Sequence, residues 1–343
     1  MLVSIIIPTK NEEKFIGKCL DSFLAQMGSK EDYEVLCVDG ISTDKTAEII
    51  KERSAHDKRI KLITNTAKVT PVAMNLGVKQ AKGDFIMVVS CHAEYASDYI
   101  DKCLEVIQRT GADQVGGYMI TCPAENTAVG AAIAAATSCR FGVGNSAFRT
   151  GGPEQEVDIV PFGMYRREVF EKIGLYDERL VRNQDLEFNK RLHKAGGKTI
   201  ISPEIKLKYY NRSTYMGLWR QAFNNGLWIP YTIWLVGSGL NLRHFIPMFF
   251  VSGLITFTIG AFWVWFLRWI LLGYILFYLF AASGFAIQVA RRTKISAILV
   301  LWSFVVLHLA YGLGSIWAII TIPFKFSNRR RGITGRLLAY RKT

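Results

Sequence analysis

The sequence predicts an α/β fold, with a mostly parallel sheet in the N-terminal part and transmembrane helices in the C-terminal part. Two short apolar strands, within residues 2–8 and 34–39, each run into a polar turn and a helix. Near-continuous apolar strands that alternate with helices are typical of parallel sheets covered on both faces. From His244 to Ala290 the only charged side chain is Arg268. This run is about twice the ~20 residues that cross a bilayer, so it predicts a helical hairpin rather than soluble core helices.

The turns after the first two strands contain the first candidate binding residues. Ligands of open α/β sheets bind beyond the carboxyl ends of the strands, where residues 8–12 and 39–44 lie. Neither turn contains G-x-G-x-x-G or G-x-x-x-x-G-K-[ST], which argues against a dinucleotide fold and a P-loop. The acidic Asp39 suits the hydroxyl groups of a ribose or a base better than a phosphate.

The next segments continue the alternation of strands and helices. We expect a helix over 47–54, a strand over 60–64, a helix over 72–81 with apolar positions at 3–4 spacing, and a strand over 85–89. The last strand ends at Ser90-Cys-His-Ala-Glu94, a third polar turn at the same edge of the sheet.

Three later segments contain further candidate residues. Residues 139–153 are rich in glycine and are interpreted either as a long surface loop or as a mobile flap. Residues 157–170 predict a strand that runs into a helix, with Gly163 allowing a ligand close to the backbone. Asp185 opens the following helix, where an acidic residue is favoured by the helix dipole.

The motifs P-x-x-N-E-E and V-D-x-x-S-x-D-x-T, in this order, resemble the start of family 2 glycosyltransferases, which have the Rossmann-like GT-A nucleotide-sugar fold. The resemblance covers residues 1–228. Members of this family carry an Asp-x-Asp metal motif at the third turn, where Ser90 falls on the first Asp, His92 on the second and Glu94 on the later ligand position. The chain is most similar to the succinoglycan-type exopolysaccharide glucosyltransferase subgroup, which has Asp-Ala-His, so Ser90 departs even from that pattern.

The resemblance implies an inverting transferase that moves a hexose, glucose by analogy, from a UDP-sugar to a hydroxyl of a lipid-linked saccharide in cell-surface or exopolysaccharide biosynthesis. Asp185 corresponds to the base of a Glu-Asp pair in which Gln184 replaces the Glu. A divalent cation, Mn²⁺ or Mg²⁺, would neutralise the leaving diphosphate, and an imidazole ligand favours Mn²⁺. The donor-binding candidates are Pro8, Asn11, Glu12, Asp39, Ser42, Lys68 and Ser90. The metal candidates are His92 and Glu94, and the acceptor or diphosphate candidates are Arg149, Gly163, Gln184, Arg212 and Gln221.

Two alternatives remain open at this point. One is a polyprenyl-phosphate sugar transferase, whose acceptor is the phosphate itself. The other is a catalytically weak binding subunit of a polysaccharide-assembly complex, because Ser90 and Gln184 replace two acidic residues of the family pattern. A processive, polymer-secreting synthase is disfavoured, because only Gln221 matches the Gln-x-x-Arg-Trp motif of those enzymes.

The expected organisation is a cytosolic catalytic domain (1–214), an interfacial amphipathic helix or linker (215–242), transmembrane helices within 243–324 (near 243–267, 269–290 and 295–323) and a basic tail (325–343). The formal charge of +14 comes partly from arginines beside the apolar stretches and in the tail. Such residues favour the cytoplasmic side and anionic lipid, and no nucleic-acid reader motif accompanies them.

These features predict a multi-pass protein of the inner (plasma) membrane, and the oligomeric state stays open. Three full spans would leave the basic tail outside, against the positive-inside tendency. A break at Tyr311-Gly-Leu-Gly-Ser315 into two re-entrant half-helices would return the tail to the cytosol.

Overall fold

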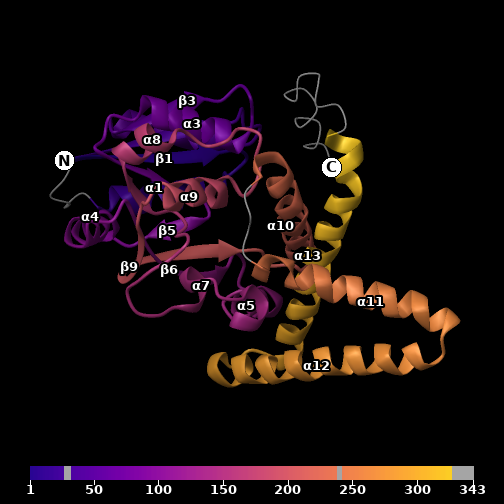
Figure 1. The fold of residues 1–343 in the computed structure, drawn as a ribbon. Helices are drawn as coiled ribbons and strands as arrows, with labels where there is room; N and C mark the ends of the chain where they lie inside the picture. Colours follow the sequence, from indigo (N-terminus) through magenta and orange to yellow (C-terminus); the bar gives the residue numbers. More distant parts are fainter. Residues whose placement is uncertain (27–31, 238–241, 327–343) are drawn as a thin grey trace. The chain divides into compact units, whose positions relative to one another are not determined.

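The computed structural model describes residues 1–26, 32–237 and 242–326, which divide into two units (Figure 1). The first unit comprises residues 1–120 and 151–209, and the second comprises 121–150 and the described part of 210–326. Residues 121–150, which the sequence analysis includes in a domain over 1–214, therefore cluster with the C-terminal helices. The basic tail beyond residue 326 lies outside the described residues.

The first unit is built on a mixed sheet with the strand order β3-β2-β1-β4-β8-β6-β9-β5, and β7 pairs with β9. β3, β2, β1 and β4 are parallel, whereas β8 and β5 pair antiparallel with their neighbours. The predicted α/β class is confirmed. The strands are β1 (Leu2–Thr9), β2 (Asp32–Asp39), β3 (Ile60–Thr64), β4 (Phe85–Val88), β5 (Ala93–Tyr95), β6 (Gln114–Pro123), β7 (Gln155–Glu156), β8 (Met164–Arg166) and β9 (Thr199–Asn211).

Both faces of the parallel strands are covered, as their near-continuous apolar sequence predicts. Ile6 belongs to a core cluster with residues of α3, α8 and α9. Its neighbours Ile5 and Ile7 point to the other face, because side chains alternate along a strand, and both are fully buried. The helices of this unit are α1 (Ile16–Leu24), α2 (Thr46–His56), α3 (Thr70–Gln80), α4 (Tyr99–Thr110), α8 (Arg167–Ile173) and α9 (Gln184–Lys194).

The second unit is helical. Its elements are α5 (Ala128–Ala136), α6 (Arg140–Val143), α7 (Ala147–Thr150), α10 (Tyr215–Val236), the 3-10 helix η1 (Leu242–Phe245), α11 (Ile246–Trp263), α12 (Phe266–Thr293) and α13 (Ala297–Phe326). The segment predicted as a long glycine-rich loop thus contains two single-turn helices, α6 and α7. Thr214 caps α10 by accepting a hydrogen bond from the Gly217 N–H.

The three apolar stretches recognised in the sequence form α11, α12 and α13, each long and apolar enough to cross a membrane. α11 and α12 form an antiparallel hairpin (Figure 1). The break considered at residues 311–315 does not occur, because α13 runs as one helix from Ala297 to Phe326.

Candidate functional site

The loops after β1 and β2 are joined by hydrogen bonds at the carboxyl edge of the sheet. Asn11, with φ 55°, donates its backbone N–H to Ser42 Oγ at 2.9 Å and accepts from the Thr43 N–H through its side-chain oxygen at 2.8 Å. The Glu12 N–H donates to Thr46 Oγ1 at 2.7 Å. The P-x-x-N-E-E and V-D-x-x-S-x-D-x-T segments therefore form one rigid rim rather than two independent turns.

Asp39 lies at the centre of this rim and is only 6% exposed. Its carboxylate accepts hydrogen bonds from the N–H and the hydroxyl of Ser42. Its backbone oxygen accepts from the Asn65 N–H at 2.7 Å, which attaches the loop after β3. Lys68 lies in that loop with φ 59°, and its backbone N–H donates a hydrogen bond to the Asn65 backbone oxygen. Asn65 was missed by sequence reasoning, although its place directly after a strand end could have identified it.

Pro8 lies at the end of β1, in register with Val38 of β2. The predicted donor-binding residues before position 70 are therefore gathered by parallel strands β1, β2 and β3. A cluster of fixed carboxylate, hydroxyl and amide groups at this edge suits a ligand rich in hydroxyl groups.

His92, at the end of the loop after β4, contacts the first loop. Its Nε2 lies 3.2 Å from Glu12 Oε1, and its ring packs edge-on against Phe15 at 4.5 Å between centroids. Ser90 accepts a hydrogen bond from the His92 N–H through its hydroxyl. Glu94 lies in β5, opposite Lys208 of β9. The structure thus brings His92 together with Glu12, which the sequence analysis assigned to the donor rather than to a metal.

No group of three or more His, Cys, Asp or Glu side chains among the described residues is placed to hold a metal ion. The His92–Glu12 pair nevertheless presents a nitrogen and an oxygen donor at one point. Mg²⁺ is commonly bound by one or two carboxylates together with substrate phosphates. The donor atoms therefore fit a cation that arrives with a diphosphate, and not a preformed all-protein cage.

Asp185 lies in the first turn of α9, preceded by Asn183 in the left-handed conformation (φ 61°). Its Oδ1 accepts a hydrogen bond from the Leu186 N–H at 2.9 Å. The residue retains access to solvent, yet the protein packed around the carboxyl removes part of its hydration. This desolvation raises the pKa of Asp185, while hydrogen bonds from the backbone oppose the shift.

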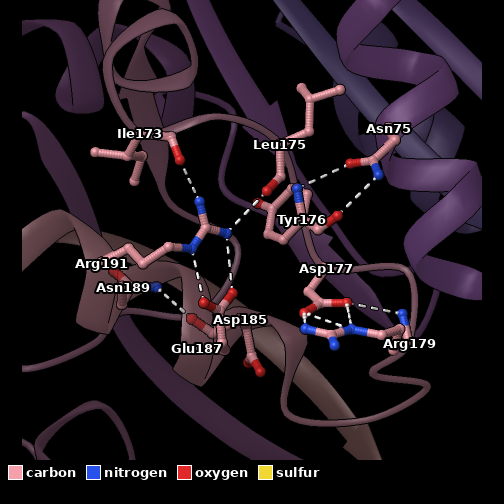
Figure 2. A network of polar contacts seen from close by, with 10 residues as sticks. All are labelled: Asn75, Ile173, Leu175, Tyr176, Asp177, Arg179, Asp185, Glu187, Asn189 and Arg191. Atoms are coloured by element: carbon pink, nitrogen blue, oxygen red, sulfur yellow. Dashed lines mark hydrogen bonds and ion pairs between the residues drawn. The ribbon is translucent and has the colours of Figure 1, made fainter. Parts of the chain in front are cut away.

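A polar network holds α9 against the segment that follows α8 (Figure 2). The Arg191 guanidinium donates to both oxygens of Glu187, at 2.7 and 2.9 Å, to the carbonyl oxygen of Leu175 at 2.8 Å and to that of Ile173. The side chain of Asn75, in α3, accepts a hydrogen bond from the Tyr176 backbone N–H and donates one to the Tyr176 backbone oxygen. These bonds position the helix that carries Asp185.

Two buried tyrosines lie near Asp185. Tyr165 and Tyr176 pack against Phe188, and burial, with a smaller contribution from the Asp185 charge, raises the pKa of both hydroxyls. Asn189 donates through Nδ2 to the Asp185 backbone oxygen at 2.9 Å and to Tyr165 Oη at 3.2 Å. Sequence reasoning missed these residues, because nothing in the local pattern shows that Tyr165 and Tyr176 fold against α9.

The remaining candidates have different surroundings. A Cβ atom at Gly163 would lie 2.3 Å from the backbone oxygen of Val115 in β6. The position therefore requires glycine because β6 packs directly against it. Gln184 begins α9, and its Oε1 is buried without a hydrogen-bond partner among the described residues. Arg149, Arg212 and Gln221 belong to the second unit. Their assignment to the acceptor or diphosphate stays a prediction.

Comparison with known proteins identifies relatives of this chain. The sequence pattern of glycosyl transferase family 2 matches residues 4–174. A dolichyl N-acetyl-alpha-D-glucosaminyl phosphate 3-beta-D-2,3-diacetamido-2,3-dideoxy-beta-D-glucuronosyltransferase from Methanococcus voltae is 35% identical over 232 residues, which are 65% of this chain and 71% of that protein. The succinoglycan biosynthesis protein ExoA of Rhizobium meliloti is 30% identical over 224 residues, 65% of this chain and 67% of its own.

A solved structure shares the fold. The mannosyltransferase PcManGT from Pyrobaculum calidifontis, in complex with GDP-Man and Mn²⁺, aligns with a TM-score of 0.57 at 17% identity. The alignment covers 92% of this chain and 87% of that one.

Proposed function

Because the chain belongs to glycosyl transferase family 2, we propose that it transfers a hexose from a UDP-sugar, with inversion, to a hydroxyl of a lipid-linked saccharide. The acceptor class is supported by the relatives, one named for a dolichyl-phosphate-linked sugar and one for succinoglycan biosynthesis. The choice of UDP and of glucose rests on the sequence resemblance.

The observation that carries the proposal is the environment of Asp185. A general base works best when its pKa approaches the operating pH, and partial desolvation raises the pKa of this carboxyl. The network of Arg191 and Glu187 holds the helix that presents it. Asp185 would accept the proton of the acceptor hydroxyl as that oxygen attacks the anomeric carbon.

The rim around Asp39 would hold the nucleoside of the donor. Asp39 has a fixed orientation because Ser42 donates twice to its carboxylate. The His92–Glu12 pair would hold a divalent cation together with the phosphates of the donor. Such a cation, when bound, supplies positive charge to the leaving diphosphate. The imidazole and carboxylate would position that charge at the edge of the sheet.

Release of UDP by the detergent-purified full chain tests this function, with UDP-glucose, a lipid-linked saccharide extract and Mn²⁺ supplied. We expect Asp185→Asn to abolish release while UDP binding persists. Asp98→Asn is the matched control, since Asp98 is exposed before α4 and should leave turnover unchanged. His92→Ala should raise the Mn²⁺ concentration needed for half-maximal release.

The same assay separates the two alternatives. An ionised phosphate acceptor needs no general base, so full activity of Asp185→Asn with a polyprenyl phosphate would indicate the polyprenyl-phosphate transferase. Absence of turnover with every UDP-sugar and GDP-sugar, in spite of nucleotide binding, would indicate a binding subunit.

A further inference from the structure

The helices of the second unit do not pack as three parallel membrane spans, although α11, α12 and α13 are each long enough to cross. We propose that only the α11–α12 hairpin crosses the bilayer, and that α13, paired with α10, lies in the headgroup layer at the base of this hairpin. By chain connectivity, the segments before α11 and the tail after α13 then face the same side of the membrane.

The hairpin has the surface of a membrane-spanning element. Its two helices hold one another through Tyr274, whose ring stacks on Phe250 at 5.7 Å and whose hydroxyl donates to the Phe250 oxygen. Among the described residues of α11 and α12, only Val251, Ala282 and Ala286 are buried. Apolar side chains elsewhere on the hairpin are exposed on all sides. Helices that are apolar all round need a hydrocarbon environment.

The first half of α13 packs against the base of the hairpin. Val300 and Phe304 share a buried cluster with Ala286 of α12. His308 Nδ1 lies 3.0 Å from Tyr278 Oη. The two helices therefore run antiparallel at this point: later residues of α13 contact earlier residues of α12. If α13 continued beside α12 as a third span, its next residues would contact residues 274 to 266.

That continuation does not occur. At Gly312, a Cβ atom would lie 2.3 Å from the Pro247 oxygen, in the first turn of α11. α13 has therefore crossed from one helix of the hairpin to the base of the other. Figure 1 shows the same arrangement, with α13 crossing the hairpin steeply and continuing beside α10.

The second half of α13 is paired with α10 through small residues. A Cβ at Gly226 would lie 2.0 Å from the Tyr311 oxygen, and one at Gly314 would lie 2.1 Å from the Phe223 oxygen. Ser315 Oγ donates to the Gly226 oxygen at 3.0 Å. Small residues at these positions allow the two helix backbones to approach this closely. This contact commits this half of α13 to α10 and not to the hairpin.

Length and charge place the hairpin across the bilayer. α11 has 18 residues, or ~27 Å of helix, close to the ~30 Å hydrocarbon core. Trp263, Trp265 and Trp269 are exposed at the turn, and tryptophan is enriched at membrane interfaces. The cations Arg291, Arg292 and Lys294 lie at the opposite end. The positive-inside rule therefore puts the base on the cytoplasmic side.

The outer face of α13 is suited to the interfacial layer. Ile298, Trp302, Trp317 and Phe324 are exposed along it, and this apolar face can enter the headgroup boundary while α10 packs against another face of α13. The same surface would keep the chain beside membrane-confined molecules.

Thiol labelling of the full-length chain in intact bacterial cells tests the inference. Val264→Cys, at the turn, should react with a membrane-impermeant maleimide from outside. Ser296→Cys and Thr343→Cys, before and after α13, should react only after the inner membrane is permeabilised. The parent chain measures labelling of its six native cysteines, and Val264→Ser shows that the signal at the turn requires a thiol.

Labelling of Thr343→Cys in intact cells would mean that α13 crosses the bilayer and would overturn the proposal. Labelling of Val264→Cys only after permeabilisation would mean that the hairpin does not cross, with the same consequence. A green fluorescent protein fused to the C-terminus gives an independent readout when a cysteine variant fails to insert. We expect it to fluoresce, as it does in the cytoplasm, and absence of fluorescence at normal expression would contradict the inference.

Discussion

Replacement of Arg191 by Met removes the centre of the network that positions Asp185. Arg191 donates to Glu187, Leu175 and Ile173 (Figure 2), and its side chain is 30% exposed while that of Glu187 is 8% exposed. Loss of one partner of a buried ion pair costs about 3–5 kcal/mol. Because part of Arg191 faces solvent, water can replace some of the lost bonds, so we expect about 2–3 kcal/mol.

This loss is measurable as a fall in melting temperature. For a domain of this size, 1 kcal/mol corresponds to about 2–4 °C, so we expect Arg191→Met to melt about 4–12 °C lower by circular dichroism. The turnover number should fall, because the helix carrying Asp185 loses its support. The KM for the donor should change little, because the donor candidates lie at the ends of β1, β2, β3 and β4 and not on α9.

Two variants control this experiment. Arg109→Met makes the same substitution in an exposed ion pair with Glu154, where little change in melting temperature is expected. Arg191→Lys keeps the charge beside Glu187 but cannot reach all four acceptor oxygens, so it should fall between Arg191→Met and wild type. A melting temperature of Arg191→Met no lower than that of Arg109→Met would refute the assigned role of the network.

Three further predictions concern single groups. The raised pKa of Asp185 means that the folded state binds its proton more tightly than the unfolded state, so stability falls as pH rises through the interval above the ordinary pKa of about 3.9. Asp185→Asn should therefore melt above wild type at pH 7, with the difference vanishing below pH ~3.5; a constant difference across pH would contradict this. Gly314→Ala should destabilise the membrane helices by about 1–3 kcal/mol through overpacking, whereas Gly273→Ala, with open space around it, should not; equal melting of the two would count against the α10–α13 packing. Gly117→Ala should prevent normal folding, because its Cβ would lie 1.8 Å from the Ile205 oxygen; recovery of soluble, native-melting protein would show that the sheet can adjust.

The local pattern of the sequence predicted the first half of the fold closely. The strand expected over 60–64 is β3, and the strand expected over 85–89 is β4 with one residue fewer. Continuous apolar runs between polar turns carry this information without reference to the rest of the chain. The long strands β6 and β9 were not predicted, because they are only partly buried and mix polar with apolar residues.

Only one part of the site was predictable from the sequence, namely the grouping of residues that follow directly after parallel strands. Strand ends at one edge of a parallel sheet must lie together, which correctly grouped Asn11, Asp39 and Ser42. The contact of His92 with Glu12 was not predictable, since it depends on how two loops fold over the edge. The assignments of the candidate residues to donor, metal and acceptor stay predictions.

The sequence alone determined that the chain has an α/β unit with polar turns at its strand ends and apolar helices toward its C-terminus, because strand and helix periodicity and hydropathy are local properties. Only the tertiary structure decided what surrounds Asp185 and which partner α13 takes. Tyr165 and Tyr176 reach Asp185 through folding, and α13 meets α10 because glycines on both helices allow their backbones to touch. Such contacts depend on how the surfaces of two separate elements fit together, and the hydropathy of the sequence does not predict that fit.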